Sequence, residues 1–309
     1  MLDDALARRH RWVNRLQSAL LIGVLVGQAA LLVLLIGGPP FALLAVVLGL
    51  STVGLAAGSA GRIVLRMYRA RPVSAVEAPG LIGLVEALAG RAGLEALPRV
   101  YWIPSAVPNA LSTWVDGRPA VAVTEGLLRS LPHRELAGVL AHEIGHITNR
   151  DLVVMGIADG FSRFTAGLGP VGMALVMVGW LGADATTQWV GLVLASSPTV
   201  ATLLQLALSR TREFQADLAA VELTGDPEGL ASALLRIEAP TSFLQRLVGL
   251  SGRDPNPSYL RTHPATEERV ARLRALKPAR RHALPKPLQA RGWAARPAAP
   301  RLHRWGTWY

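Results

Sequence analysis

The sequence predicts a mainly α-helical protein with a small β-sheet and four helices that cross a membrane. The first observation is composition. Of the 309 residues, 51% are hydrophobic and 17% are charged, whereas about a quarter of the residues in soluble domains are charged. The second observation is that apolar residues gather in uncharged blocks long enough to span a bilayer. Between the blocks lie stretches with helical periodicity and one hairpin signal, which predict a folded α+β domain in water.

The first two predicted spans form a hairpin near the N-terminus. Residues 16–38 and 41–61 carry no charge over 23 and 21 positions, and each run can cross a hydrocarbon core of about 30 Å as a helix. The turn at 37–40 is Gly-Gly-Pro-Pro. The alternatives are a pair of buried core helices or a cleaved signal peptide. The length of both uncharged runs argues against them.

Arginines flank this hairpin on its two outer ends, whereas its turn has none. They are Arg8, Arg9, Arg11 and Arg15 before the first span, and Arg62, Arg66, Arg69 and Arg71 after the second. By the positive-inside rule, both flanks face the cytoplasm. We therefore expect a multi-pass protein of the inner or plasma membrane whose folded domain lies on the cytoplasmic side.

The first part of that domain combines a helix with a short sheet. Asp116-Gly117 stands between two apolar runs and is a strong signal for a hairpin turn. The expected elements are a helix at 79–92, a strand at 100–103, paired strands at 110–115 and 120–124, and a helix from Leu131 onwards.

A second apolar block predicts the third and fourth spans, at 164–181 and 189–208. Glycines and Pro198 interrupt these runs, which spans tolerate. The alternative is a pair of apolar helices packed on the enzyme at the bilayer surface. After the block, Asp226-Pro227 marks a helix start, residues 240–262 resemble a loop, and Pro264 opens a last helix.

These patterns divide the chain into five segments. They are an N-terminal hairpin at 1–71, the first part of the domain at 72–151, a second membrane hairpin at 152–208, the second part of the domain at 209–276, and a basic tail at 277–309. The tail holds eight Lys and Arg and no acid, so the net charge of +11 falls to +3 without it. We therefore do not expect the folded part to bind nucleic acid. An anionic membrane surface or plain solvation explains the tail equally well.

The run His142-Glu143-Ile144-Gly145-His146 matches the HExxH pattern. On a helix, positions i and i+4 share a face, so both imidazoles can reach one metal ion. Glu143 lies beside the metal and can hold and deprotonate a water molecule. The chain has no cysteine, so a metal must use histidine and carboxylate donors, which suit one Zn²⁺.

Catalytic zinc sites usually have three protein ligands, and the ten residues after His146 contain no histidine. The third ligand should therefore be a carboxylate on a later helix. Glu213 is the best candidate, in the run Ser-Arg-Thr-Arg-Glu-Phe-Gln-Ala-Asp at 209–217. Asp217 lies one turn later on the same face, where it can accept a hydrogen bond from a ligand histidine. Arg212 can either help bind an oxyanion or pair with an acid of the domain.

From about residue 10 to residue 276 the chain resembles the HtpX-like membrane metalloproteases, relatives of the CAAX prenyl proteases in the gluzincin group. The resemblance depends on the N-terminal hairpin, Pro108-Asn109-Ala110, the HEIGH helix, the 209–217 run and Thr262-His263-Pro264. It implies a zincin-like peptidase domain with Glu213 as third zinc ligand. It also implies that Asn109 and Ala110 bind an extended substrate at an edge strand, and that His263 stands near the scissile bond as a candidate oxyanion stabiliser.

The expected activity is zinc-dependent cleavage of unfolded or damaged polypeptides, including membrane proteins, in protein quality control and stress response. Two alternatives share parts of the pattern. A CAAX-type prenyl-protein processing protease would use the same chemistry but needs a large intramembrane chamber, for which four spans are too few. A catalytically silent membrane scaffold would be expected if the site lacked a residue type, and none is missing.

Overall fold

The computed structural model describes residues 61–182, 185–238 and 266–276, together with Trp12 and most of the positions between 16 and 31, and Leu34. Several predictions lie outside the described residues. These are the second span at 41–61, the loop at 240–262, His263 and the basic tail.

A four-stranded mixed sheet forms one layer of the domain, in the order β1-β2-β4-β3. Its strands are β1 (Arg71–Pro72), β2 (Arg99–Ile103), β3 (Ala110–Val115) and β4 (Arg118–Thr124). The predicted hairpin is confirmed: β3 pairs antiparallel with β4, and Asp116 and Gly117 take φ values of 54° and 72°, as a type I′ turn requires. β2 runs parallel to β4. Strand β3 therefore forms one edge of the sheet.

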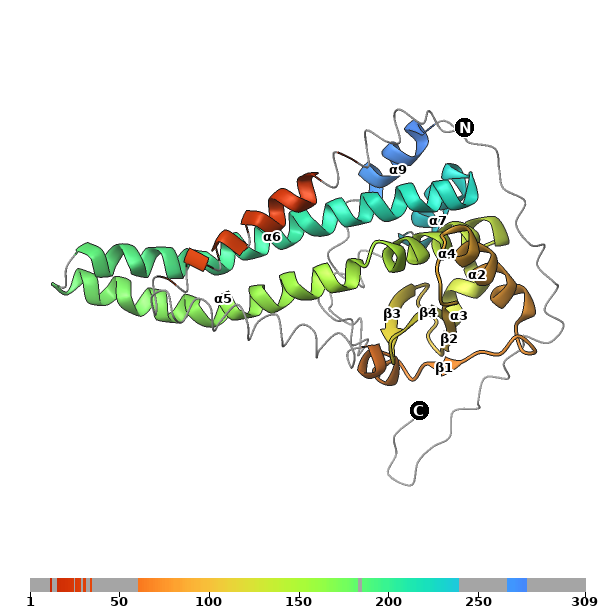
Figure 1. Cartoon of the computed structure of the whole chain (residues 1–309), viewed down its shortest axis with the longest axis horizontal. Helices are drawn as coiled ribbons and strands as arrows, with labels where there is room; N and C mark the ends of the chain where they lie inside the picture. The colour runs from red at the N-terminus through yellow and green to blue at the C-terminus, as the bar shows by residue number, and fades with distance from the viewer. Residues whose placement is uncertain are drawn as a thin grey trace, which may run out of the picture.

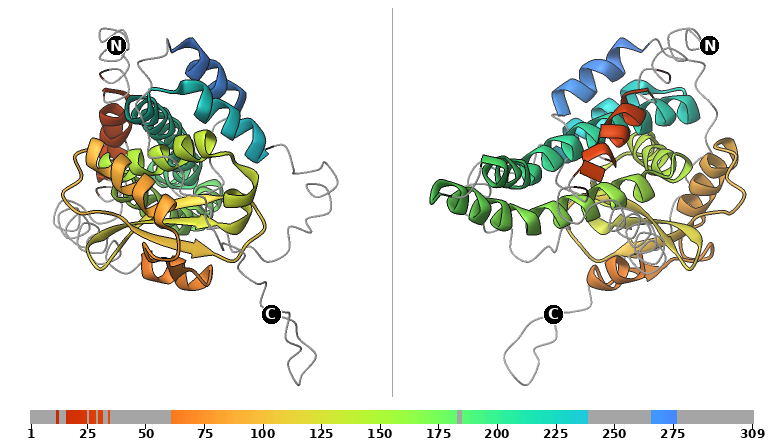
Figure 2. Two further views of the ribbon diagram at one scale, coloured as in Figure 1. Left: turned by 90° about the vertical axis from the view of Figure 1, so that its right-hand side faces the viewer. Right: turned by 60° about the vertical axis from the view of Figure 1, so that its left-hand side comes forward.

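Helices cover one face of this sheet and enclose the main core (Figures 1 and 2). Nearest the sheet are α2 (Pro79–Arg91), α3 (Glu125–Ser130) and α4 (His133–Thr148), and α7 (Pro227–Glu238) and α9 (Thr266–Ala275) add a further layer on α4 that completes the core. The helical residues 61–67 pack against the opposite face through Leu65, which shares a smaller core with Ile103 and Leu111. The helices expected at 79–92, from Leu131 and from Asp226-Pro227 are all present, whereas β1 and α3 were not predicted.

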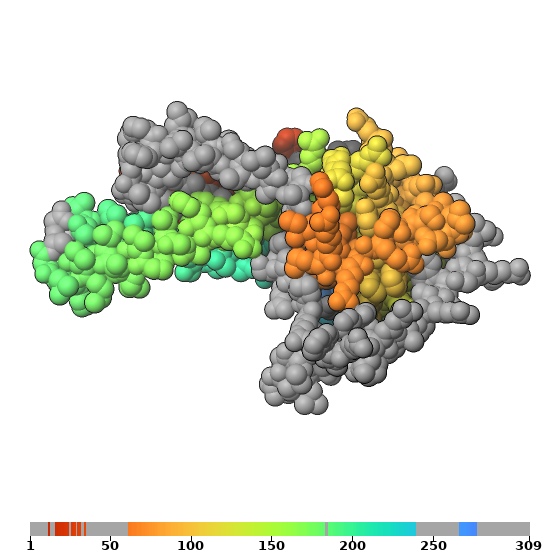
Figure 3. Space-filling view, turned by 90° about the horizontal axis from the view of Figure 1, so that it is seen from below, coloured from red at the N-terminus to blue at the C-terminus, as the bar shows by residue number. Residues whose placement is uncertain are grey.

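Two long helices, α5 (Asp151–Trp180) and α6 (Ala185–Thr224), project from the domain as an antiparallel pair (Figures 1 and 3). Both are long and apolar enough to cross a membrane, and most of their apolar windows face outward. Among the described residues these are the two candidate spans. The predicted first span is described in part, as helical residues alongside α6, where the Gln28 amide donates to the Ser197 carbonyl at 3.1 Å.

Small residues allow α5 and α6 to pack closely. A Cβ atom on Gly172 would lie 2.2 Å from the Ala195 backbone nitrogen, and one on Gly191 would lie 2.6 Å from that of Val176. This is the small-residue packing typical of membrane helices. Pro198 leaves the Leu194 carbonyl without its helical donor, and Ser197 Oγ donates to that carbonyl at 2.7 Å.

Helix α6 continues without a break for 40 residues. It therefore passes through position 208, where the sequence changes from apolar to polar, and enters the folded domain. The metal-site residues of its polar half are consequently part of the same rigid element as the membrane segment.

Candidate metal centre

The two histidines of the HExxH run lie on the buried side of α4. One turn of helix separates them, and their Nε2 atoms are 3.1 Å apart. His142 is 6% exposed, and His146 is half-buried. The helix presents both ring nitrogens on one face, as the i and i+4 spacing predicts.

Glu213 reaches the same point from α6. Its Oε2 lies 3.4 Å from His142 Nε2, and its Oε1 lies 3.7 Å from His146 Nε2. The donor atoms of all three residues fall within 4.8 Å of one another. In a tetrahedral zinc site, bonds of about 2.0–2.1 Å place neighbouring donors roughly 3.3 Å apart. The Nε2–Nε2 separation and the two Nε2–oxygen separations, which involve different oxygens of Glu213, are close to that spacing, so the two histidines and the carboxylate can converge on one ion.

A glycine allows α6 to approach α4 at this position. A Cβ atom on Gly145 would lie 3.1 Å from the Ala219 side chain and 3.2 Å from the Ala216 carbonyl oxygen. These contacts are tighter than ordinary van der Waals contact, so a side chain here would require α6 to shift by a few tenths of an ångström. The glycine inside the HExxH run thus permits the contact that brings Glu213 to the histidines.

The other ring nitrogen of each histidine, as an N–H group, donates a hydrogen bond to an aspartate. His142 Nδ1 lies 3.0 Å from Asp217 Oδ1, and His146 Nδ1 lies 2.7 Å from Asp151 Oδ2. Such carboxylates orient metal-binding imidazoles and fix their tautomer. The sequence predicted this contact for Asp217. It did not predict it for Asp151, the first residue of α5.

An arginine holds each of these aspartates. Arg269, on α9, contacts Asp217 through Nε at 2.9 Å and Nη2 at 2.6 Å, and its Nη1 lies 2.9 Å from Glu213 Oε2. Arg212 Nη1 donates to Asp151 Oδ1 at 3.1 Å. Arg212 was expected either to help bind an oxyanion or to pair with an acid of the domain, and in the structure it pairs with an acid. Arg269 was missed, although its spacing of four from the buried Leu273 places it on the inner face of its helix.

The donor set suits a divalent cation by charge as well as by geometry. Four acids surround the two histidines, and two arginines offset half of their charge, which leaves −2 when both imidazoles are neutral. The acids are Glu143, Asp151, Glu213 and Asp217, all less than a tenth exposed, and the arginines are Arg212 and Arg269. A dication restores neutrality in this buried cluster, where an uncompensated charge is costly.

The protonation of the histidines in the metal-free protein follows the same logic. Burial lowers the pKa of His142, but hydrogen bonds to Asp217 and Glu213 outweigh it and raise the pKa to about 9. For His146, burial is again the largest effect and lowers the pKa, but the hydrogen bond to Asp151, together with the charges of Glu213 and Asp151, raises the pKa overall. Without a metal, the raised pKa values of both histidines favour their charged forms, which offset the charge of the acids.

Glu143 follows His142 on α4 and is 8% exposed. In the described part of the chain it makes no hydrogen bond or ion pair, although it lies close enough to Arg269 to interact electrostatically. Its carboxylate is therefore not committed to a structural contact. A carboxylate in this position can accept a proton from a water molecule held beside the histidines.

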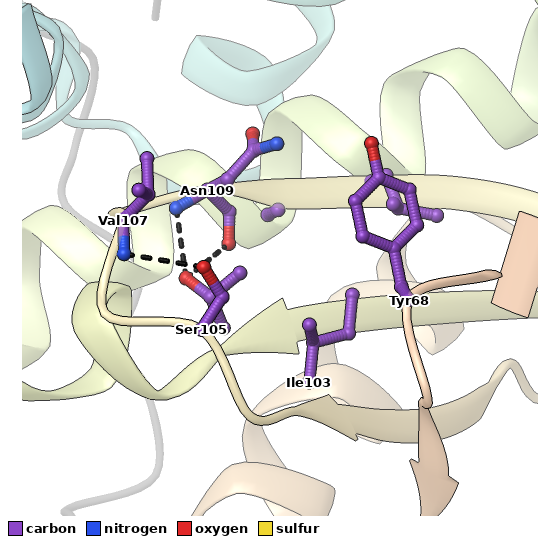
Figure 4. A pocket seen from close by; sticks show the side chains of 8 residues that line it. Tyr68, Ile103, Ser105, Val107 and Asn109 are labelled. Atoms are coloured by element: carbon purple, nitrogen blue, oxygen red, sulfur yellow. Dashed lines mark hydrogen bonds between the residues drawn. The ribbon is translucent and has the colours of Figure 1, made fainter. Parts of the chain in front are cut away.

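The predicted substrate-binding residues lie at the start of the edge strand (Figure 4). The Asn109 backbone pairs with Thr124, whose Oγ1 accepts from the Asn109 nitrogen at 2.8 Å. The Asn109 side-chain amide points to the opposite side of β3 from Ser105 (Figure 4). Ala110 begins β3 and packs on the same core as α4. A small pocket beside them is lined by Tyr68, Ile103, Ser105, Val107, Asn109, Ala110, Leu111 and Thr124.

Similar proteins in other organisms include proteases. A match to Peptidase family M48 covers residues 76–277. The Protease HtpX homolog of Acaryochloris marina is 38% identical over 287 residues, which cover 86% of this chain and 95% of that one. The homolog of Desulfatibacillum aliphaticivorans is 35% identical over 282 residues, covering 86% and 90%.

A solved structure, that of S. mikatae Ste24p, is 20% identical, covers 85% of this chain and 65% of that one, and has a TM-score of 0.47. The resemblance that the motifs predicted is confirmed by the family match and by the two homologs. The chain belongs to Peptidase family M48 and is a membrane metalloprotease.

Proposed function

We propose that this protein is a zinc-dependent endopeptidase of the inner or plasma membrane, with its active site on the cytoplasmic side. The observation that carries the proposal is the convergence of His142, His146 and Glu213 on one point, with Glu143 beside them. Nitrogen and carboxylate oxygen donors at this spacing suit zinc. A bound zinc ion would lower the pKa of a water molecule towards 7 and polarise the substrate carbonyl.

Each residue of the site would then have its own role in hydrolysis. Glu143 accepts a proton from the attacking water and later passes it to the leaving amine. Asp217 and Asp151 keep the imidazoles in the tautomer that leaves Nε2 free for the metal. Arg269 holds Asp217 and Glu213 in place. His263, which follows the 240–262 segment in sequence, is our candidate for stabilising the oxyanion.

We further propose that the substrate binds as an added strand along β3. Strand β3 pairs with β4 on one side only, so in the described sheet its other edge offers backbone donors and acceptors. An extended polypeptide would gain main-chain hydrogen bonds there, near Asn109 and Ala110. This mode favours chains that are unfolded or loosely folded. Damaged membrane proteins are therefore the proposed substrates, and protein quality control under stress is the proposed role.

One experiment on the purified full-length protein tests this proposal. We expect one zinc per chain by elemental analysis and cleavage of casein that a chelator abolishes and added zinc restores. Protein incubated with the chelator and then given magnesium is the control, because Mg²⁺ prefers oxygen ligands in octahedral geometry. Cleavage that persists after the metal has been removed would refute the proposal.

A further inference from the structure

A single carboxylate joins the metal centre to both helices of the projecting pair. Asp151 is the first residue of α5 and is 3% exposed. Its Oδ2 lies 2.7 Å from His146 Nδ1, and its Oδ1 accepts from Arg212 Nη1 at 3.1 Å. Arg212 belongs to α6. The three side chains are thus contributed by three different helices.

The backbone is shaped to bring Asp151 to this position. Helix α4 ends at Thr148, and Arg150 takes a left-handed conformation with φ of 54°. Non-glycine residues adopt this conformation at some cost in energy. The turn starts α5 only five residues after His146. As a result, the carboxylate at its first position reaches back to the ring.

The order of residues on α6 also links Asp151 to the metal centre. Arg212 immediately precedes Glu213, so the guanidinium that binds Asp151 and the carboxylate that faces the histidines are fixed to one another by the helix. Any displacement of α5 along α6 would therefore act on His146 through Asp151. The two membrane helices and two of the three metal donors form one connected unit.

Stability alone is a weak explanation for this arrangement. Buried ion pairs are often no more stabilising than apolar residues of similar volume. This pair is also incompletely satisfied, because Arg212 Nε is buried without a hydrogen-bond partner in the described part of the chain. The guanidinium instead spans Asp151 and Gln215, whose Oε1 lies 3.3 Å from Nη1. The position of the Arg212 guanidinium therefore fixes Asp151 in place but leaves the ion pair itself with one unsatisfied nitrogen.

We infer that Asp151 and Arg212 are positioning residues that set the orientation of His146 from the base of the membrane hairpin. Asp151 accepts a hydrogen bond from the Nδ1–H group and so turns Nε2 towards the metal, and Arg212 keeps Asp151 in place. Neither residue touches the substrate in this scheme. The inference depends on the proposed metal site, and it adds a dependence of that site on the contact between α5 and α6.

The test measures metal binding by full-length protein in detergent, with zinc affinity from chelator competition and the visible spectrum of the cobalt-substituted protein. We expect Asp151→Ala to weaken zinc binding by on the order of 10–100-fold, as loss of an orienting partner does, and to change the cobalt bands. Arg212→Gln should weaken binding less. The double variant should bind zinc about as weakly as Asp151→Ala, since Arg212 acts through Asp151.

A matched control is available on the same helix. Asp159 pairs with Arg163 at 2.9 Å, and the Arg163 side chain is 72% exposed. Asp159→Asn should leave the zinc affinity and the cobalt spectrum unchanged. If Asp151→Ala does not fold, Asp151→Asn replaces it, because the amide keeps an acceptor oxygen but loses the charge that holds Arg212. Its zinc affinity should fall between those of the parent and a ligand variant.

The outcomes separate this inference from the proposed function. A parent protein that binds no zinc would refute the proposed function itself. A parent that binds zinc, together with a folded Asp151 variant of equal affinity and identical cobalt spectrum, would refute only the positioning role. A variant that melts at lower temperature but keeps both metal properties would show that the pair is merely structural.

Discussion

Glu213 is the residue that turns a pair of histidines into a three-donor site. We predict that Glu213→Ala lowers zinc occupancy to a small fraction of one per chain, because three protein donors fall to two. Asp217→Ala should cost less, on the order of 10–100-fold in affinity. Chelator competition measures both, with Glu86→Ala on the exposed face of α2 as the control. Parent-like zinc binding by Glu213→Ala would mean that another residue is the third ligand.

The raised pKa of His142 makes a prediction for the metal-free protein. Its folded pKa of about 9 exceeds the ordinary value of 6.5. Protonated His142 therefore stabilises the metal-free fold fully below pH 6.5, and this contribution disappears as the pH rises through 9.

We accordingly expect the melting temperature of the metal-free protein to fall between pH 6.5 and 9. The melting temperature of the zinc-loaded protein should fall less over the same pH range, because its ligand histidines are already neutral. Thermal unfolding of both forms at matched pH values provides the measurement. A metal-free protein that becomes more stable across this interval would contradict the assigned hydrogen bonds.

Among the individual residues of the site, the sequence predicted those that are identified by local spacing or by the need for a third ligand. It missed those whose role depends on contacts formed only in the folded chain. His142 and His146 follow from helical geometry, and Glu213 follows from the need for a third donor. Asp151 lies only five residues after His146, yet its role depends on the turn at Arg150, which no local pattern indicates. Arg269 contacts an aspartate 52 positions away, so only the folded chain reveals it.

At the scale of elements, the contact between α4 and α6 decides whether the three donors meet. Gly145 permits this contact. We predict that Gly145→Ala lowers zinc affinity by about tenfold, comparable to the loss of an orienting partner. It should do so without a matching loss of fold stability, because alanine favours the helix over glycine by about 1 kcal/mol.

Gly83→Ala on α2 is the matched control, since a Cβ atom there would meet nothing within 4 Å. It should leave the zinc affinity unchanged and raise the stability slightly. Zinc titrations and thermal melts of both variants make the comparison. Equal zinc affinity for Gly145→Ala and Gly83→Ala would show that the close approach of α6 does not control the site.

Helices and strands were predictable where the hydrophobic periodicity or a turn signal in the sequence is strong. The hairpin of β3 and β4 was found because Asp-Gly favours its turn, and α7 was found because Asp226 caps it, accepting from the Gly229 nitrogen at 3.1 Å. Strand β1 has two residues, too few for a periodic pattern. The unbroken length of α6 was not foreseen, because the change from lipid-facing to domain-facing residues at 208 alters composition but not the helix.

At the scale of the whole molecule, the candidate metal centre lies at the base of the projecting pair, whose helices are long and apolar enough to cross a membrane. Helix α5 starts at Asp151 and α6 carries Glu213, so both helices of the pair extend from the candidate site. This arrangement accords with a role in clearing damaged membrane proteins.

The orientation of the hairpin can be tested with single cysteines, because the chain has none. We predict that Leu181→Cys, at the exposed end of α5, reacts with a membrane-impermeant maleimide in intact cells. Glu86→Cys, on the exposed face of α2, should react only after permeabilisation. The reverse pattern would place the active site outside the cytoplasm, and protection of both positions in intact cells would mean that α5 and α6 do not span the membrane.

The central claim is that the molecule is a metal-dependent enzyme in which Glu143 moves protons and does not bind the metal. Glu143→Gln keeps the shape of the side chain and removes the base. We predict that the purified variant contains one zinc per chain and folds like the parent, while casein cleavage falls by about 10²–10⁴-fold, as expected for loss of a general base. Parent-like cleavage by a zinc-loaded Glu143→Gln protein would contradict the account.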